Sequence, residues 1–445
     1  MAKGRPTIFT SLKNKVGGAL RDSFPPALFL LTGLLWLLVA FVLGLALWLS
    51  TILGYPLPQA FRLLHVHGAL VGGVAQIILG AMLAFIPPLL MTGKDRPDSH
   101  PVLFGMINAG TIGMLIGFAL GYSMIIGGAG LLVIAAFLSL LRGALRQART
   151  SLVSPPLNLW FYGTALLALL GGLGVGEAMT AQLFTHQSIG QARLAHIHLN
   201  LLGFVTLTIV GTMHNLFPTV LNTRLHSPRL AQVTFFVMPS GIAVLLIGFM
   251  LGNLRVDIVA GMILMIGVFL YGYNIVRTWV NAGRPRSAPS DHFLLATFFL
   301  VLAVLTGLLV TINSQWSPPP VPFGTLHLMA YTHLAMIGFI FQTILGALSH
   351  LLPITLAASR VPSNKKRGPY LAELTKIVEY WRPIQVGSLN LGTIGLALVA
   401  ALLWQFHLGS LAVKIGAWIC SGLLLLGFGI FAGKVCLLYA RRPTP

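Results

Sequence analysis

The chain has 445 residues, of which 56% are hydrophobic and only 8% are charged, and its mean hydropathy is +0.88. A soluble protein of this length carries roughly three times that charged fraction, so an ordinary soluble domain is excluded. The net charge of +20 comes mainly from Lys and Arg in short segments between apolar runs. This is the pattern of the positive-inside rule, and it argues against a nucleic-acid partner.

Long apolar runs recur along the whole chain and predict an all-α integral membrane protein with twelve transmembrane helices. In chain order the runs cover 26–50, 62–90, 101–121, 124–143, 157–179, 193–220, 231–252, 256–277, 292–312, 325–353, 384–405 and 411–437. The longest polar interval, about 354–383, is predicted to be amphipathic and cytoplasmic.

Threading the chain through twelve spans from a cytoplasmic N-terminus tests this count. All of the 28 Lys and Arg then fall at cytoplasmic segments except Arg62, Arg193, Arg255 and Lys414. The N-terminal segment has no obvious cleavable signal and carries the basic residues Lys3, Arg5, Lys13, Lys15 and Arg21, while Lys94 and Arg96 follow the second span. We therefore expect a multi-pass protein of a bacterial or archaeal inner (cytoplasmic) membrane, with both termini cytoplasmic.

One sequence pattern occurs three times, at 62–87, 193–218 and 328–353, in spans two, six and ten. Without a gap, each copy has a histidine, two glycines and a proline at identical spacing. The four aligned sets are His67, His198, His333; Gly72, Gly203, Gly338; Gly80, Gly211, Gly346; and Pro87, Pro218, Pro353. The copies lie 131 and 135 residues apart, which predicts one transmembrane domain, 1–445, built from three four-helix units at about 26–143, 157–277 and 292–437.

Two residues before each shared histidine stand His65, His196 and Tyr331. A histidine inside a span is costly to leave unpaired, so such histidines predict a functional site. Residues i and i+2 of a helix point about 200° apart, so a His-x-His pair serves two different neighbours.

If the three repeat helices form a ring, three pairings follow. These are His333 with His65, His67 with His196, and His198 with Tyr331. Two opposed histidines are the ligands of a six-coordinate haem. The pattern therefore predicts one haem site at His65 and His333, and permits a second at His67 and His196.

Other matched positions leave two interpretations open. The aligned glycines suit either close helix packing or the space that a flat macrocycle needs. Gln76 and Gln342 match between two copies and suit hydrogen bonds between helices.

The stretch Tyr331-Thr-His333, followed by Gly346-Ala-Leu-Ser-His350-Leu-Leu-Pro353, resembles a motif of subunit I of the haem-copper oxidase superfamily, which includes the nitric oxide reductases. That family is known for twelve spans in three pseudo-symmetric groups of four. The resemblance implies haem b ligation by His333 together with His65, and redox partners in the membrane or periplasm that are linked to cytochrome c or quinol. It is sharp over span ten and moderate over span two, where Arg62 precedes the histidines.

The sequence also departs from that family. The ligand of the high-spin haem is replaced by Tyr331, and the copper-binding His pair of span seven is missing, since 231–252 contains no histidine. Copper is therefore not expected. Tyr331 is interpreted either as an axial ligand or as an interhelical hydrogen-bonding residue, with His327 one turn before it and Glu177 in span five as further catalytic candidates.

The remaining candidates are given other roles. His214 and His350 are placed about 24 Å from the haem level, at 1.5 Å per residue of α-helix. An interfacial ion pair with Arg255 is expected for Asp257. Loop or interface positions are predicted for His100, His186, His226, His292 and His407.

Three functions are compatible with these observations. The first is a haem b-binding membrane oxidoreductase or electron-transfer subunit without a standard haem-copper centre. The second is a nitric oxide or oxygen reductase, or detoxification protein, with a modified high-spin site. The third is a non-enzymatic transporter or metal-handling protein, because pseudo-symmetric bundles also suit transporters. The absence of C-x-x-C-H excludes covalently attached haem.

Overall fold

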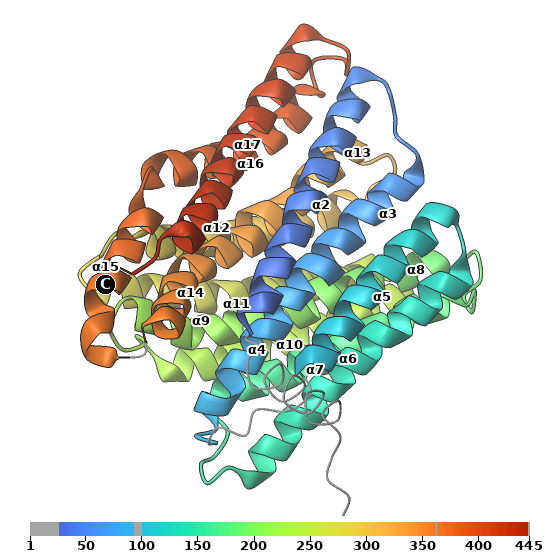
Figure 1. Ribbon diagram of the computed structural model, residues 1–445. Coiled ribbons are helices and arrows are strands. Elements are labelled where there is room, and N and C mark those ends of the chain that lie inside the picture. The colour runs from blue at the N-terminus through green and yellow to red at the C-terminus, as the bar shows by residue number, and fades with distance from the viewer. Residues whose placement is uncertain (1–25, 93–99, 362, 444–445) are drawn as a thin grey trace, which may run out of the picture. The chain divides into compact units, whose positions relative to one another are not determined.

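The computed structural model describes residues 26–92, 100–361 and 363–443, and over these residues every regular element is a helix (Figure 1). The N-terminal basic residues named above, and Lys94 and Arg96, lie outside the described residues. Twelve helices of the described chain are long and apolar enough to cross a membrane, and their bounds lie within a few residues of the predicted runs except at the C-terminal ends of the fourth and tenth spans, which extend seven residues further. The predicted all-α membrane architecture is confirmed.

The first six spans are α2 (Ala27–Leu53), α3–η1–α4 (Gln59–His67, Gly68–Ala75, Gln76–Leu89), α5 (His100–Leu120), α6 (Ser123–Thr150), α7 (Leu157–Thr180) and α8–η2–α9 (Ile189–His198, Leu199–Thr206, Leu207–Val220). The last six are α10 (Pro228–Leu251), α11 (Leu254–Asn281), α12 (Ala288–Asn313), α13–η3–α14 (Thr325–His333, Leu334–Phe341, Gln342–Arg360), α16 (Arg382–Leu402) and α17 (Leu411–Ala440). Between the tenth and eleventh spans lies a shorter helix, α15 (Asn364–Glu379).

Each repeat span changes from α-helix to π-helix immediately after its shared histidine. The π segments η1, η2 and η3 are eight residues long and occupy the same place in all three copies. A π turn hydrogen-bonds from i to i+5, is rare, and is frequent at functional sites. The distance of about 24 Å predicted between the haem level and His214 or His350 assumed an uninterrupted α-helix. In the structure the π segments η2 and η3 interrupt the helix between these positions.

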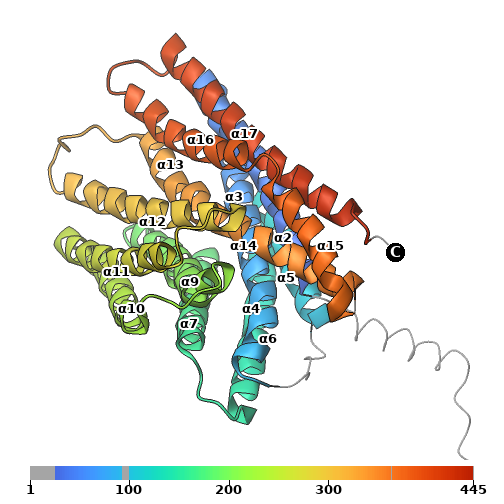
Figure 2. The ribbon, with the colours of Figure 1, turned by 90° about the vertical axis from the view of Figure 1, so that its left-hand side faces the viewer.

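By its internal contacts the chain divides into two compact units. The described part of the first covers 26–44, 58–92, 100–159 and 180–183, and that of the second covers 45–57, 160–179, 184–361 and 363–443. In the first unit α5 and α6 form an antiparallel pair, and α5 also packs on α3 and η1 (Figure 1). In the second, α10 packs on α11, α16 packs on α17, and α12 packs on α14 and η3 (Figure 2).

The second glycine of each repeat copy packs against a phenylalanine of the preceding span. A Cβ atom at Gly80 would lie 2.5 Å from a Phe29 side-chain atom, and one at Gly211 would lie 2.5 Å from Phe161. The third copy has the same contact, with Phe293 at 2.8 Å from a Cβ on Gly346. Since all three phenylalanines are fully buried, these glycines serve close helix packing.

The helix α15 is amphipathic, as predicted for this interval. Its buried face carries Tyr370, Leu374 and Val378 and packs on α14 and α17 (Figure 2). Its opposite face is exposed and includes Lys366 and Lys376.

Candidate haem-ligand histidines and a buried polar chain

The first histidine of each His-x-His pair faces the preceding span of its own unit. The Nδ1 atom of His65 donates to the carbonyl oxygen of Ala40 at 2.7 Å, and that of His196 donates to Gly172 at 2.8 Å. Each ring also lies against a glycine one turn further along that span. A Cβ atom on Gly44 would be 2.6 Å from His65 Cε1, and one on Gly176 would be 2.9 Å from His196 Cε1.

The second histidine of each pair turns to the other side of the helix. The rings of His67 and His198 pack on Phe118 of α5 and Phe249 of α10, with centroids 4.5 and 4.8 Å apart. The expectation that residues i and i+2 serve different neighbours is met, because one histidine contacts the span before and the other the span after.

These second histidines donate to their own helix. The Nδ1 atoms of His67, His198 and His333 lie 3.0, 2.8 and 2.6 Å from carbonyl oxygens four residues earlier. A carbonyl oxygen only accepts, so Nδ1 carries the proton in all five repeat histidines. The neutral ring therefore has its lone pair on Nε2, which is the arrangement found in histidines that bind metal.

The ring model also pairs His198 with Tyr331, and both belong to the second unit. Tyr331 points to the preceding span, where a Cβ atom on Gly307 of α12 would lie 2.7 Å from its hydroxyl oxygen. His198 packs on α10 instead, so the two side chains contact different helices.

His327 caps the helix α13. Its Nδ1 accepts a hydrogen bond from the backbone N–H of Gly324 at 3.2 Å, and its ring stacks on Trp404 with centroids 5.6 Å apart. Because Nδ1 is the acceptor, the neutral ring carries its proton on Nε2, opposite to the repeat histidines.

Two acidic candidates, Glu177 and Asp257, lie in the second unit. Glu177 is partly exposed and follows Gly176, which contacts His196. Asp257 is 7% exposed and faces Gly248 of α10, and the expected ion pair with Arg255 is not among those of the described residues.

The ring of His214 contacts the rings of Phe161 and Tyr271, and neither of its nitrogens has a hydrogen-bond partner among the described residues. His350, in α14, is partly exposed.

The prediction for His292 was wrong. It lies in the first turns of α12 but is fully buried, and it connects the side chains of Gln342 and Gln385. The prediction that Gln342 hydrogen-bonds between helices is confirmed. Its counterpart Gln76 is fully buried, and neither polar atom of its side chain has a hydrogen-bond partner among the described residues.

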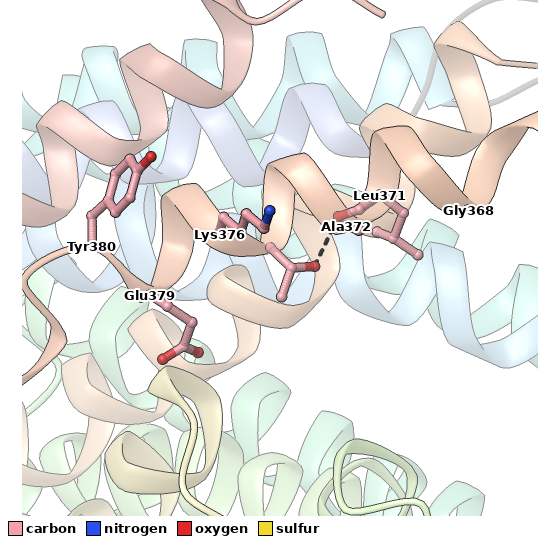
Figure 3. Close-up of a pocket in the computed structure, with 7 residues that line it drawn as sticks. Gly368, Leu371, Ala372, Lys376, Glu379 and Tyr380 are labelled. Atoms are coloured by element: carbon pink, nitrogen blue, oxygen red, sulfur yellow. Dashed lines mark hydrogen bonds between the residues drawn. The ribbon is translucent and has the colours of Figure 1, made fainter.

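A hollow of about 600 Å³ follows the outer face of α15 and is separate from the repeat helices (Figure 3). It is lined by Gly368, Leu371, Ala372, Thr375, Lys376, Glu379 and Tyr380. All of these belong to α15 or directly follow it, so the hollow is a surface groove of one helix.

Over its described residues the chain has the fold of an integral membrane protein, with twelve helices long and apolar enough to span a membrane. The solved structure of a heme-copper terminal oxidase dimer matches it with a TM-score of 0.71 and 11% sequence identity, covering 94% of this chain and 85% of that chain. No protein-family model matches the sequence, and no curated protein matches it. The chain thus shares the fold of a heme-copper terminal oxidase, as the resemblance of span ten predicted.

Proposed function

We propose that this protein is a membrane oxidoreductase or electron-transfer subunit that holds haem b through His65 and His333. The same pairing permits a second haem, with His67 and His196 as its ligands. The observation that carries the proposal is the hydrogen bonding of the repeat histidines, each of which donates from Nδ1 to a backbone carbonyl. The oxidase fold supports it, and the pairing of ligands rests on the sequence repeat.

The residues fit the group on chemical grounds. Imidazole is the usual axial ligand of haem b, and a hydrogen bond from Nδ1 fixes the tautomer and raises the basicity of Nε2. Bound haem would supply reversible one-electron chemistry of its iron. Ala40 orients His65, and Met329 orients His333.

A pyridine haemochrome assay with iron quantification tests the proposal. We expect purified protein to show a b-type spectrum, and His65→Ala or His333→Ala to remove the part of the reduced α-band that comes from the haem they hold. His407→Ala, in an exposed loop, is the matched control and should leave the spectrum unchanged. The proposal is refuted if the protein has no Soret band, or if both ligand variants keep the wild-type α-band.

Electron transfer is favoured over gas reduction by the contacts of the two residues nearest a modified high-spin site. Tyr331 lies against the backbone of α12, and His327 caps a helix with the nitrogen that would otherwise bind metal. We expect carbon monoxide to leave the reduced spectrum unchanged. A carbon monoxide shift would instead support the reductase alternative.

The remaining parts of the proposal concern the surroundings. We place the protein in a bacterial or archaeal inner membrane with cytoplasmic termini. Its partners would be membrane or periplasmic redox proteins linked to cytochrome c or quinol. The arrangement of basic residues between the spans supports this orientation.

A further inference from the structure

Four helices of the second unit contribute to a chain of buried polar side chains that the haem proposal does not use. Lys434 of α17 is 5% exposed, and Gln385 of α16 is 1% exposed. His292 of α12 and Gln342 of α14 are fully buried. A lysine this deeply placed in an apolar span is costly, so its partners need an explanation.

The hydrogen bonds of this chain all run in one direction. Lys434 Nζ donates to the Val378 carbonyl at 2.7 Å and to Gln385 Oε1 at 2.5 Å. With its oxygen on Lys434, the Gln385 amide presents its NH₂ group to His292 Nε2 at 3.0 Å.

His292 then donates from Nδ1 to Gln342 Oε1 at 2.6 Å. Gln342 donates in turn to Asn390 Oδ1 at 2.8 Å, and Asn390 donates to the Val386 carbonyl at 2.5 Å. The ammonium, which only donates, and the carbonyl, which only accepts, fix the direction of every bond between them.

This direction limits the number of protons that the chain can hold. A second proton on His292 would place an N–H at Nε2, facing the NH₂ group of Gln385. Reversing the Gln385 amide removes that conflict, but it turns the NH₂ group toward Lys434. Lys434 would then have to accept a hydrogen bond, which only a neutral amine can do.

We propose that Lys434 and His292 form one buried proton-binding site, in which a single positive charge resides on one residue or the other. The side-chain oxygen of Gln385 faces whichever of the two residues is charged. In the exchange an Nζ–H bond of Lys434 breaks, an Nε2–H bond of His292 forms, and Gln385 reverses. The charge inside the span stays at one.

Four charged side chains lie near Lys434 and His292, and their positive and negative charges cancel. Glu379 accepts from the Ala288 backbone N–H at 2.8 Å and pairs with Arg382 at 2.9 Å. Asp291 lies 3.4 Å from Arg382 and 3.7 Å from Arg286. Two carboxylates thus face two guanidinium groups, while the hydrogen bonds of Lys434 go to neutral oxygens.

The test reads the ring nitrogens of His292 by ¹⁵N solid-state NMR of full-length protein with labelled histidine. The signal is assigned by its loss in His292→Asn. At about pH 6, near the ordinary pKa of imidazole, the proposal expects a neutral His292 protonated at Nδ1 in the wild type. Gln385→Glu offers an acceptor oxygen to both neighbours, so His292 becomes doubly protonated in this variant. With lysine labelled as well, the same spectra show whether Lys434 is charged. A doubly protonated His292 beside a charged Lys434 in the wild type, or a neutral ring in Gln385→Glu, overturns the proposal.

A second variant keeps the test decisive if Gln385→Glu does not fold. Lys434→Met removes the competing charge, frees Gln385 to reverse, and leads to a doubly protonated His292 at the same pH. Lys376→Met removes a lysine from the exposed face of α15 and is the matched control, with His292 as in the wild type. A His292 that stays neutral in Lys434→Met shows that the two residues are not coupled.

Discussion

The ring of His65 packs against Gly44, which has no side chain. Replacing Gly44 with alanine should therefore disturb haem binding without removing a ligand. The new Cβ would lie 2.6 Å from Cε1 and 3.0 Å from Nδ1 of His65. Ordinary carbon contacts are about 3.5–4.0 Å, so the ring must move by about 1 Å. That shift breaks the 2.7 Å hydrogen bond to Ala40, at a cost of about 1 kcal/mol, and adds overpacking of about 1–3 kcal/mol.

The assay is a haem titration of the purified apoprotein, followed by its Soret band. Since about 1.4 kcal/mol corresponds to a tenfold change in affinity, we expect Gly44→Ala to bind haem at least about tenfold more weakly. Gly128→Ala, where a Cβ meets open space on α6, is the matched control. Gly176→Ala makes the same intrusion on His196, at 2.9 Å, and reports on the second ligand pair. Wild-type haem affinity in Gly44→Ala would refute the assignment of His65 as an oriented ligand.

Three further outcomes follow from the packing and topology. Gly211→Ala should lower the free energy of unfolding by about 1–3 kcal/mol, because its Cβ would lie 2.5 Å from Phe161. The control is Gly174→Ala, whose Cβ meets open space. Unfolding in denaturant measures both variants, and equal effects would contradict the packing argument. Ser227→Ala should cost about 1 kcal/mol in the same experiment, since Ser227 accepts from the Leu230 N–H at the start of α10, and an unchanged midpoint would show that this cap is dispensable. If the C-terminus is cytoplasmic as proposed, a fluorescent protein fused to it should fluoresce and a fused alkaline phosphatase should be inactive, whereas the reverse result would contradict the proposed orientation.

The spans were predictable because length and hydrophobicity are local properties of the sequence. The π segments were not, since η1, η2 and η3 are apolar runs whose composition is the same for α-helix or π-helix. Only the shared position after each histidine links them, and that link becomes visible once the backbone hydrogen bonds are known.

The buried polar chain was missed for a different reason. His292, Gln385 and Lys434 each occur singly in a different span, so no spacing within one segment connects them. The position of His292 at the start of an apolar run suggested a membrane interface. Its actual burial results from contacts with α14 and α16, which are distant in sequence.

Three glycines that each contact the first side chain of a repeat pair show where the chemistry of the third copy differs from that of the other two. Gly44 and Gly176 each contact a histidine ring, and the Nδ1 of that ring donates to the carbonyl of the residue four before the glycine. The corresponding Gly307 contacts the phenol ring of Tyr331. A phenol has no second ring nitrogen through which such a bond could orient it toward iron. At the ligand level, the third copy therefore offers imidazole only through His333, whose own helix orients it. Under the proposed function, a haem held by two imidazoles can use the third repeat helix only through His333, which is the ligand that the resemblance of span ten implies independently.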